Sequence, residues 1–177
     1  MILVVGPPRS GTSVIARILH TKLDVCMGHY LVPGNEGNPL GFYEDFMMVK
    51  ATKEKDPYPW MNALLENHTI DDNTFDFCRK RYGVKSPELA FMDMVALKPD
   101  LVIRTQRNPA DIAISLVRYH RPRITPKNAL LLVAKYEKAI DDQVAGLSCS
   151  CYQVDLRRQR DEKELEQELR EALCLCS

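Results

Sequence analysis

Apolar residues along the chain alternate between short continuous runs and helical periodicities. Residues 2–5 form a β-branched apolar run that is too short for a helix and predicts a buried strand. From Thr12 to Leu23 apolar positions recur every three or four residues, as on one face of a helix. Three further short runs predict strands, at 83–85, 101–105 and 149–154. Periodic or capped segments predict further helices, after Ser86, up to about Tyr119, after Pro126 and from Asp161.

Strands that alternate with helices predict a three-layer α/β fold, in which helices flank a central parallel sheet. A chain of 177 residues suits one compact domain, residues 1–177. Within it, the charged segment at about 43–82 predicts a small helical insertion. Ligands of such sheets bind beyond the carboxyl ends of the strands. The turns after Val5, Lys85 and Thr105 are all expected at that edge.

Composition excludes some classes of function. The net charge of +0 argues against a broad nucleic-acid surface, so no nucleic-acid partner is expected. No apolar run approaches the ~20 residues of a membrane span, and the N-terminus does not resemble a secretory signal. We therefore expect a cytoplasmic protein without a membrane span, in which disulfides are disfavoured. The C-x-C spacing of four of the six cysteines does not suit zinc, and no metal site is expected.

The stretch "GPPRSGTS", residues 6–13, has the outline of a phosphate-binding loop between a strand and a helix. A nucleotide-hydrolysing loop would carry a lysine where Thr12 stands. Backbone amides at the start of the helix, hydroxyl groups and the Arg9 guanidinium can nevertheless bind an anion. The alternative is a simple glycine turn with a Ser or Thr helix cap, which would account for one hydroxyl residue only.

Several motifs together resemble the sulfotransferases that use 3′-phosphoadenosine 5′-phosphosulfate (PAPS), especially the bacterial-type members. "PPRSGTS" is similar to their 5′-phosphosulfate loop, and "RNPADIAIS" is similar to their 3′-phosphate motif. The family pattern is also matched by "VKSPEL", which is followed by "KPDLVIRTQRNP". It is matched again at the end of the chain by "YQVDL" and the charged helix after it. The resemblance is weakest in residues 45–80. It implies a fold like that of the P-loop NTPases and the transfer of a sulfuryl group from PAPS to a hydroxyl or amine acceptor.

The resemblance also implies roles for individual residues. The 5′-phosphosulfate would be held by the phosphate loop, through Arg9, Ser10, Gly11, Thr12 and Ser13. The 3′-phosphate would be held by Arg107 and Ser115, and Lys85 would lie near the transferred sulfuryl group. On general grounds, Arg107 could instead pair with Asp111, and Ser115 could be a small packing residue.

The general base does not follow from the same motifs. Small-molecule sulfotransferases place a histidine where this chain has Pro87, so the base must come from elsewhere. "NPLGFYED" resembles a bacterial segment whose glutamate corresponds to Glu44, which we favour as the base. His29 is the second candidate, because a histidine titrates near neutral pH without any shift. Glu44 could also be a helix-start acid, and His29 a surface loop residue.

Two other classes compete with the sulfotransferase prediction. A P-loop kinase or NTPase would need the loop lysine, and would leave "RNPADIAIS" unexplained. A catalytically inactive nucleotide-binding protein is the other alternative. PAPS is therefore the expected co-substrate, no metal is expected, and the acceptor is a small molecule, a carbohydrate or another hydroxyl-bearing compound. The sequence leaves the oligomeric state open.

Overall fold

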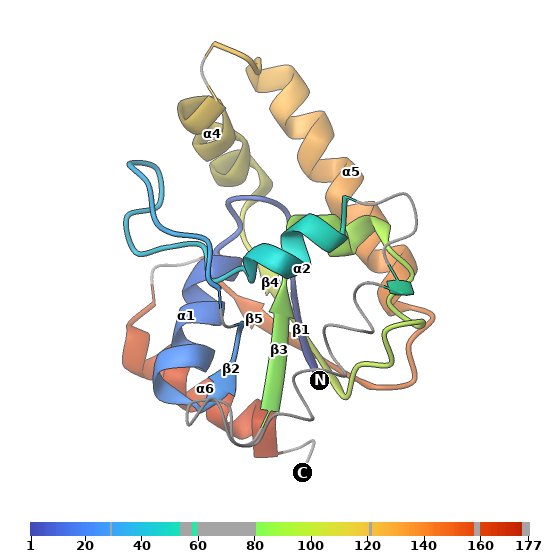
Figure 1. Ribbon diagram of the computed structural model, residues 1–177. Helices are drawn as coiled ribbons and strands as arrows, with labels where there is room; N and C mark the ends of the chain where they lie inside the picture. The colour runs from blue at the N-terminus through green and yellow to red at the C-terminus, as the bar shows by residue number, and fades with distance from the viewer. Residues whose placement is uncertain (29, 54–57, 60–80, 121, 158–159, 175–177) are drawn as a thin grey trace.

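The computed structural model describes residues 1–28, 30–53, 58–59, 81–120, 122–157 and 160–174 (Figure 1). Its centre is a five-stranded, all-parallel sheet with the strand order β2-β3-β1-β4-β5. The strands are β1 (Ile2–Val5), β2 (Val25–Cys26), β3 (Arg81–Lys85), β4 (Leu101–Gln106) and β5 (Ser150–Asp155). The register places Leu3 of the central strand β1 opposite Val84 of β3 and Val102 of β4.

Helices cover both faces of this sheet because the strand residues of β1 alternate between them. Val4 packs into a core with α1 (Thr12–Lys22) and α6 (Glu162–Cys174). Leu3 packs on the other face, in a core that includes α2 (Phe46–Ala51), the 3₁₀ helix η1 (Pro87–Phe91) and α5 (Pro126–Val144). The helix α4 (Pro109–His120) packs mainly against α5. The predicted α/β architecture with a parallel sheet flanked by helices is confirmed.

One predicted helix is wrong. The segment after Ser86 forms only the short η1, and its chain then turns through residues 92–97. The Asp93 carboxylate accepts hydrogen bonds from the amides of Val95 and Ala96, at 3.0 and 3.3 Å. A side chain that binds nearby amides in this way competes with helical hydrogen bonding. The helix that Ser86 and Pro87 were expected to begin therefore stops after five residues.

Two other features differ from the sequence-based expectation. The two-residue strand β2 was not predicted, because two residues give no periodicity to detect. Cys26, its last residue, is disulfide-bonded, so the expectation of unpaired cysteines is wrong at this position. Spacing along the chain carries no information on such a pairing, which depends on Cα positions in the fold. Cys151 and Cys174 are free thiols.

The expected helical insertion is described only in part. α2 begins after Asp45, whose carboxylate accepts hydrogen bonds from the amides of Met47 and Met48. This is a helix N-cap of the usual acidic kind. Residues 54–57 and 60–80, which carry most of the expected insertion, lie outside the described residues.

Candidate functional site

The turn between β1 and α1 has the backbone of an anion-binding loop. Arg9 and Gly11 both adopt positive φ angles, 72° and 100°, and Ser10 N–H donates to Pro7 C=O at 3.0 Å. Gly11 is the N-cap of α1, and in the described part of the chain no side chain caps the first amides of this helix. Such amides are available to a ligand, and the helix dipole favours an anion there.

The hydroxyl group of Ser10 makes a tertiary contact and does not act as a helix cap. Ser10 Oγ lies 2.7 Å from Thr105 Oγ1, and both residues are buried at the centre of the fold. Their contact requires Gly6, because a Cβ at that position would lie 2.1 Å from Thr105 Oγ1. The side chain of Ser10 therefore faces β4 and does not line the cavity described below. The simple capping alternative does not describe this loop.

Lys85, at the carboxyl end of β3, joins the phosphate loop to the loop that follows β2. Its ammonium donates hydrogen bonds to Ser13 Oγ and Phe42 C=O, each at 3.1 Å, and forms an ion pair with the Glu44 carboxylate. The side chains of Lys85 and Glu44 are only 4% and 12% exposed. Burial lowers the pKa of Lys85 from its ordinary value, and the Glu44 carboxylate opposes that effect.

Glu44 reaches Lys85 because short backbone pairing holds both ends of its loop together. Leu31 and Asp45 form an antiparallel bridge, and Val32 N–H donates to Glu44 C=O at 2.8 Å. Phe46 N–H donates to Tyr30 C=O at 2.7 Å. A carboxylate from the chain after β2 is thus held at the edge of the sheet, beside the ammonium of β3.

Arg9 connects the phosphate loop to α4. Its Nε donates to Ser115 Oγ and its terminal nitrogen donates to Gly37 C=O, both at 3.0 Å, and the guanidinium lies 5.0 Å from the centre of the Tyr119 ring. Arg107, in the turn after β4, donates to Arg9 C=O at 3.1 Å. Neither alternative raised from the sequence describes these contacts, since Ser115 binds Arg9 and Arg107 binds the loop backbone.

The loop of residues 30–45 closes over this region through a tight turn at Asn35. The Asn35 side-chain oxygen accepts hydrogen bonds from the amides of Gly37 and Asn38, both at 3.0 Å. Its amide nitrogen donates to Tyr119 Oη at 2.7 Å. Gly37 packs so closely on Tyr119 that a Cβ there would lie 2.1 Å from the ring.

These elements enclose a cavity of about 310 Å³. Seven of its lining residues were predicted from the sequence to bind or react: Arg9, Gly11, Thr12, Ser13, Glu44, Lys85 and Arg107. Ser115 is connected to it through Arg9, whereas His29 lies outside the described residues. Among the other lining residues, four polar or aromatic ones were not predicted from the sequence: Asn38, Phe42, Tyr119 and His120. Tyr119 follows Ser115 by one helical turn, and that spacing could have indicated it.

The arrangement defines an α/β protein with a cationic pocket at the carboxyl edge of its parallel sheet. Three cationic side chains and the start of α1 surround the cavity, together with one carboxylate that can accept a proton. Among the described residues, no group of three or more His, Cys, Asp or Glu side chains is placed to hold a metal ion. No described helix is both long and apolar enough to cross a membrane. No protein-family model matches the chain, and no curated protein matches it.

Proposed function

We propose that this protein transfers a sulfuryl group from PAPS to a hydroxyl or amine acceptor. The observation that carries the proposal is the position of the Lys85 ammonium, which contacts both Ser13 of the phosphate loop and the Glu44 carboxylate. An anion held by the loop would meet a cation and a proton acceptor at the same point. This combination suits a group transfer that needs charge stabilisation and a base.

Two anion-binding subsites support the choice of nucleotide. The amides of the loop and Ser13 would bind the 5′-phosphosulfate at the start of α1. Arg107 and Ser115 would bind the 3′-phosphate. Arg9 contacts both of these residues, because its Nε donates to Ser115 and its carbonyl accepts a hydrogen bond from Arg107. A nucleotide with charged groups at both the 5′ and the 3′ positions would engage all of these donors. The fold we infer is accordingly that of the P-loop-like sulfotransferases.

The reaction we propose is an in-line displacement at sulfur. The acceptor oxygen or nitrogen forms a bond to sulfur while the bond from sulfur to the 5′-phosphate oxygen breaks, and adenosine 3′,5′-bisphosphate leaves. The acceptor proton passes to the Glu44 carboxylate. Arg9, Lys85 and the helix start stabilise the charge that grows on the leaving oxygen, as in phosphoryl transfer.

The ion pair suggests how Lys85 and Glu44 would divide these tasks. In the free protein the ammonium is bound by the Glu44 carboxylate. A sulfuryl oxygen near Ser13 would compete for this ammonium, and the carboxylate would then be free to accept a proton. Glu44 is therefore our proposed base, in preference to His29.

Binding distinguishes this proposal from a kinase or NTPase. Adenosine 3′,5′-bisphosphate at a hundredfold excess over its Kd is expected to raise the Tm by about 5–10 °C. ATP with magnesium is expected to raise it much less, because the chain lacks the loop lysine. Stabilisation by ATP with magnesium, without any by the bisphosphate, would overturn the proposal in favour of the kinase or NTPase class.

A further inference from the structure

The α4–α5 hairpin projects beyond the end of the central sheet as a unit with its own small core (Figure 1). Five buried residues make up this core: Ile112, Ala113, Leu116, Ala129 and Val133. α4 packs mainly against α5, whose other end packs against η1. The projecting part, which we call the hairpin tip, comprises residues 114–120 and 122–131.

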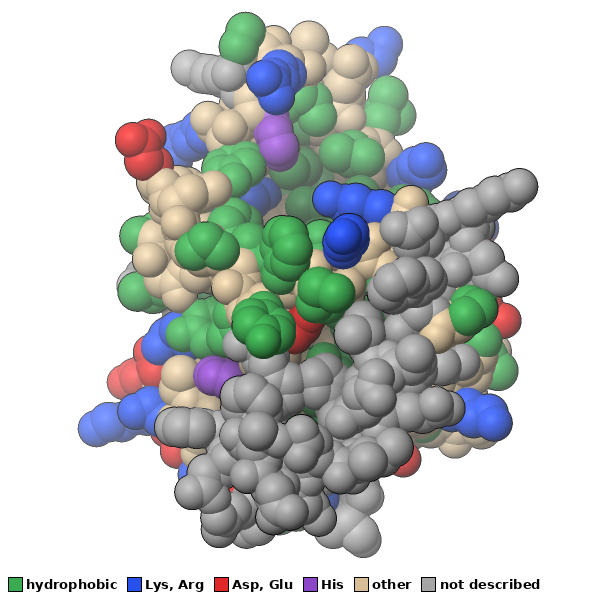
Figure 2. Space-filling model, viewed as in Figure 1, with side chains coloured by type: hydrophobic (Ala, Val, Ile, Leu, Met, Phe, Trp, Pro, Cys, Tyr) green, Lys and Arg blue, Asp and Glu red, His purple; other side chains and the backbone are tan. Residues whose placement is uncertain are grey.

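The hairpin carries an unbalanced positive charge in a chain that is neutral overall. Residues 112–136 contain five Lys or Arg residues and no Asp or Glu. In the described part of the tip, Arg118, Arg123 and Lys127 are all exposed. Figure 2 shows basic and hydrophobic side chains side by side over this end of the molecule. The exposed acid of the neighbouring loop, residues 30–45, is Glu36, which follows Asn35, the residue that donates to Tyr119.

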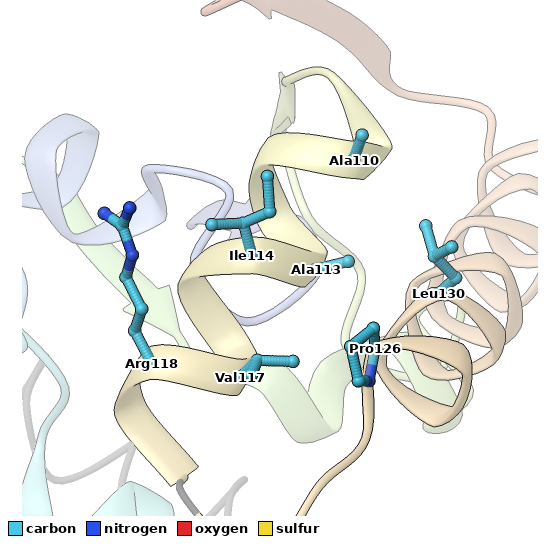
Figure 3. A pocket seen from close by; sticks show the side chains of 7 residues that line it. All are labelled: Ala110, Ala113, Ile114, Val117, Arg118, Pro126 and Leu130. Atoms are coloured by element: carbon cyan, nitrogen blue, oxygen red, sulfur yellow. The ribbon is translucent and has the colours of Figure 1, made fainter.

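An apolar groove opens between the two helices at the same place. Its cavity of about 350 Å³ is lined almost wholly by apolar side chains, with Arg118 as the one charged residue (Figure 3). Ile114 and Leu130, which line it, are 51% and 47% exposed, and the adjacent Leu131 is 61% exposed. Apolar side chains gathered on an exposed surface mark an interaction site.

We propose that the hairpin tip docks on an anionic membrane surface. Lys and Arg residues near a membrane are attracted by anionic lipid headgroups, each by roughly fivefold in partitioning. Exposed apolar side chains between them can enter the boundary between headgroups and acyl chains, as they do in interfacial helices. A projecting tip with cations spread around an open groove suits an extended anionic surface better than a single compact partner. This docking would be peripheral, and it would use other side chains of the tip than Ser115 and Tyr119, which belong to the site described above.

Sedimentation with lipid vesicles tests the proposal on the full chain. The protein should sediment with vesicles of phosphatidylcholine and phosphatidylserine, and not with vesicles of phosphatidylcholine alone. The variant Arg118→Gln/Arg123→Gln/Lys127→Gln should lose roughly a hundredfold in partitioning. The matched control Lys22→Gln/Lys98→Gln/Lys163→Gln removes the same charge from exposed positions elsewhere and should retain binding. High salt should weaken the binding of the wild type.

A second variant separates insertion from simple charge attraction. Leu130→Gln/Leu131→Gln keeps every cation and should still lose at least tenfold in partitioning, because two apolar side chains no longer enter the interface. Wild-type protein that ignores anionic vesicles, or a tip variant that binds as well as the control, would overturn the proposal. Binding of an acidic amphipathic peptide without any vesicle binding would also overturn it, and would indicate a protein partner.

Discussion

Arg9 Nε donates a hydrogen bond to Ser115 Oγ at 3.0 Å, although the two residues are 106 positions apart in the chain. The contact joins the phosphate loop after β1 to the second turn of α4. The contact therefore connects Arg9, which we assign to the 5′ end of the nucleotide, with Ser115, which we assign to the 3′ end. A ligand with both charged groups would meet Arg9 and Ser115 together.

The first prediction concerns Ser115→Ala. The affinity for adenosine 3′,5′-bisphosphate should fall by about 10- to 100-fold, because a hydrogen bond to a charged phosphate is lost. The affinity for adenosine 5′-monophosphate, which has no 3′-phosphate, should change little. Titration calorimetry with both nucleotides measures the difference. The control is Ser150→Ala, at an exposed position of β5, and an equal loss for both nucleotides would contradict the assignment.

The second prediction concerns the base. Glu44→Gln keeps the size of the side chain but removes the proton acceptor, so kcat should fall by about 10²- to 10⁴-fold. The affinity for the bisphosphate product should stay within a few-fold, because Glu44 is not assigned to the nucleotide. Glu36→Gln, on the exposed part of the same loop, is the matched control and should leave kcat unchanged. Full turnover by Glu44→Gln together with a large loss in His29→Gln would transfer the role to His29.

The third prediction follows from the burial of Lys85. Its pKa is lowered from 10.5 in the folded chain, whereas the unfolded chain keeps the ordinary value. Between these two pKa values the unfolded chain binds more protons than the folded chain. The free energy of unfolding of the protein therefore rises with pH, by up to about 1.4 kcal/mol per pH unit. Lys85→Met lacks this titration.

Denaturant unfolding across the alkaline range up to pH 10.5 measures this effect as a difference between wild type and Lys85→Met. The free energy of unfolding of the wild type should increase relative to the variant as pH rises. No relative increase up to pH 10.5, followed by a relative decrease above it, would mean that the Glu44 carboxylate outweighs burial and raises the pKa of Lys85.

The fourth prediction concerns the close approach of β1 and β4 beneath the phosphate loop. A methyl group at Gly6 would lie 2.1 Å from Thr105 Oγ1 and 2.5 Å from Ser10 Oγ. Gly6→Ala should therefore lower the free energy of unfolding by about 2–3 kcal/mol, the usual cost of overpacking. Gly146→Ala is the control, because its nearest contact would be an ordinary 3.6 Å. Equal stability of the two variants, measured by denaturant titration, would contradict this packing.

Much of the fold could be predicted from the sequence because its elements have local causes. The buried runs of β1 and β4 and the periodic apolar face of α1 each specify their own structure. The short η1 was missed because a side chain of the next turn, Asp93, ends it. β2 was missed because it depends on pairing with β3 and not on its own two residues.

The site divides in the same way. The loop residues and Lys85 could be found because they directly follow strands that end at one edge of the sheet. The ion pair between Lys85 and Glu44 could not, because it spans 41 positions and depends on how the intervening loop folds back. The inward orientation of Ser10 likewise depends on Thr105, which is 95 positions away.

Transfer of radiolabelled sulfur from PAPS tests the central claim most directly. Wild-type protein, supplied with PAPS and a mixture of phenolic, carbohydrate and amine acceptors, should release adenosine 3′,5′-bisphosphate and label an acceptor. Glu44→Gln should do so at least a hundredfold more slowly. The account would be contradicted if the wild-type protein transferred sulfur from PAPS no faster than Glu44→Gln and instead hydrolysed or used ATP with magnesium.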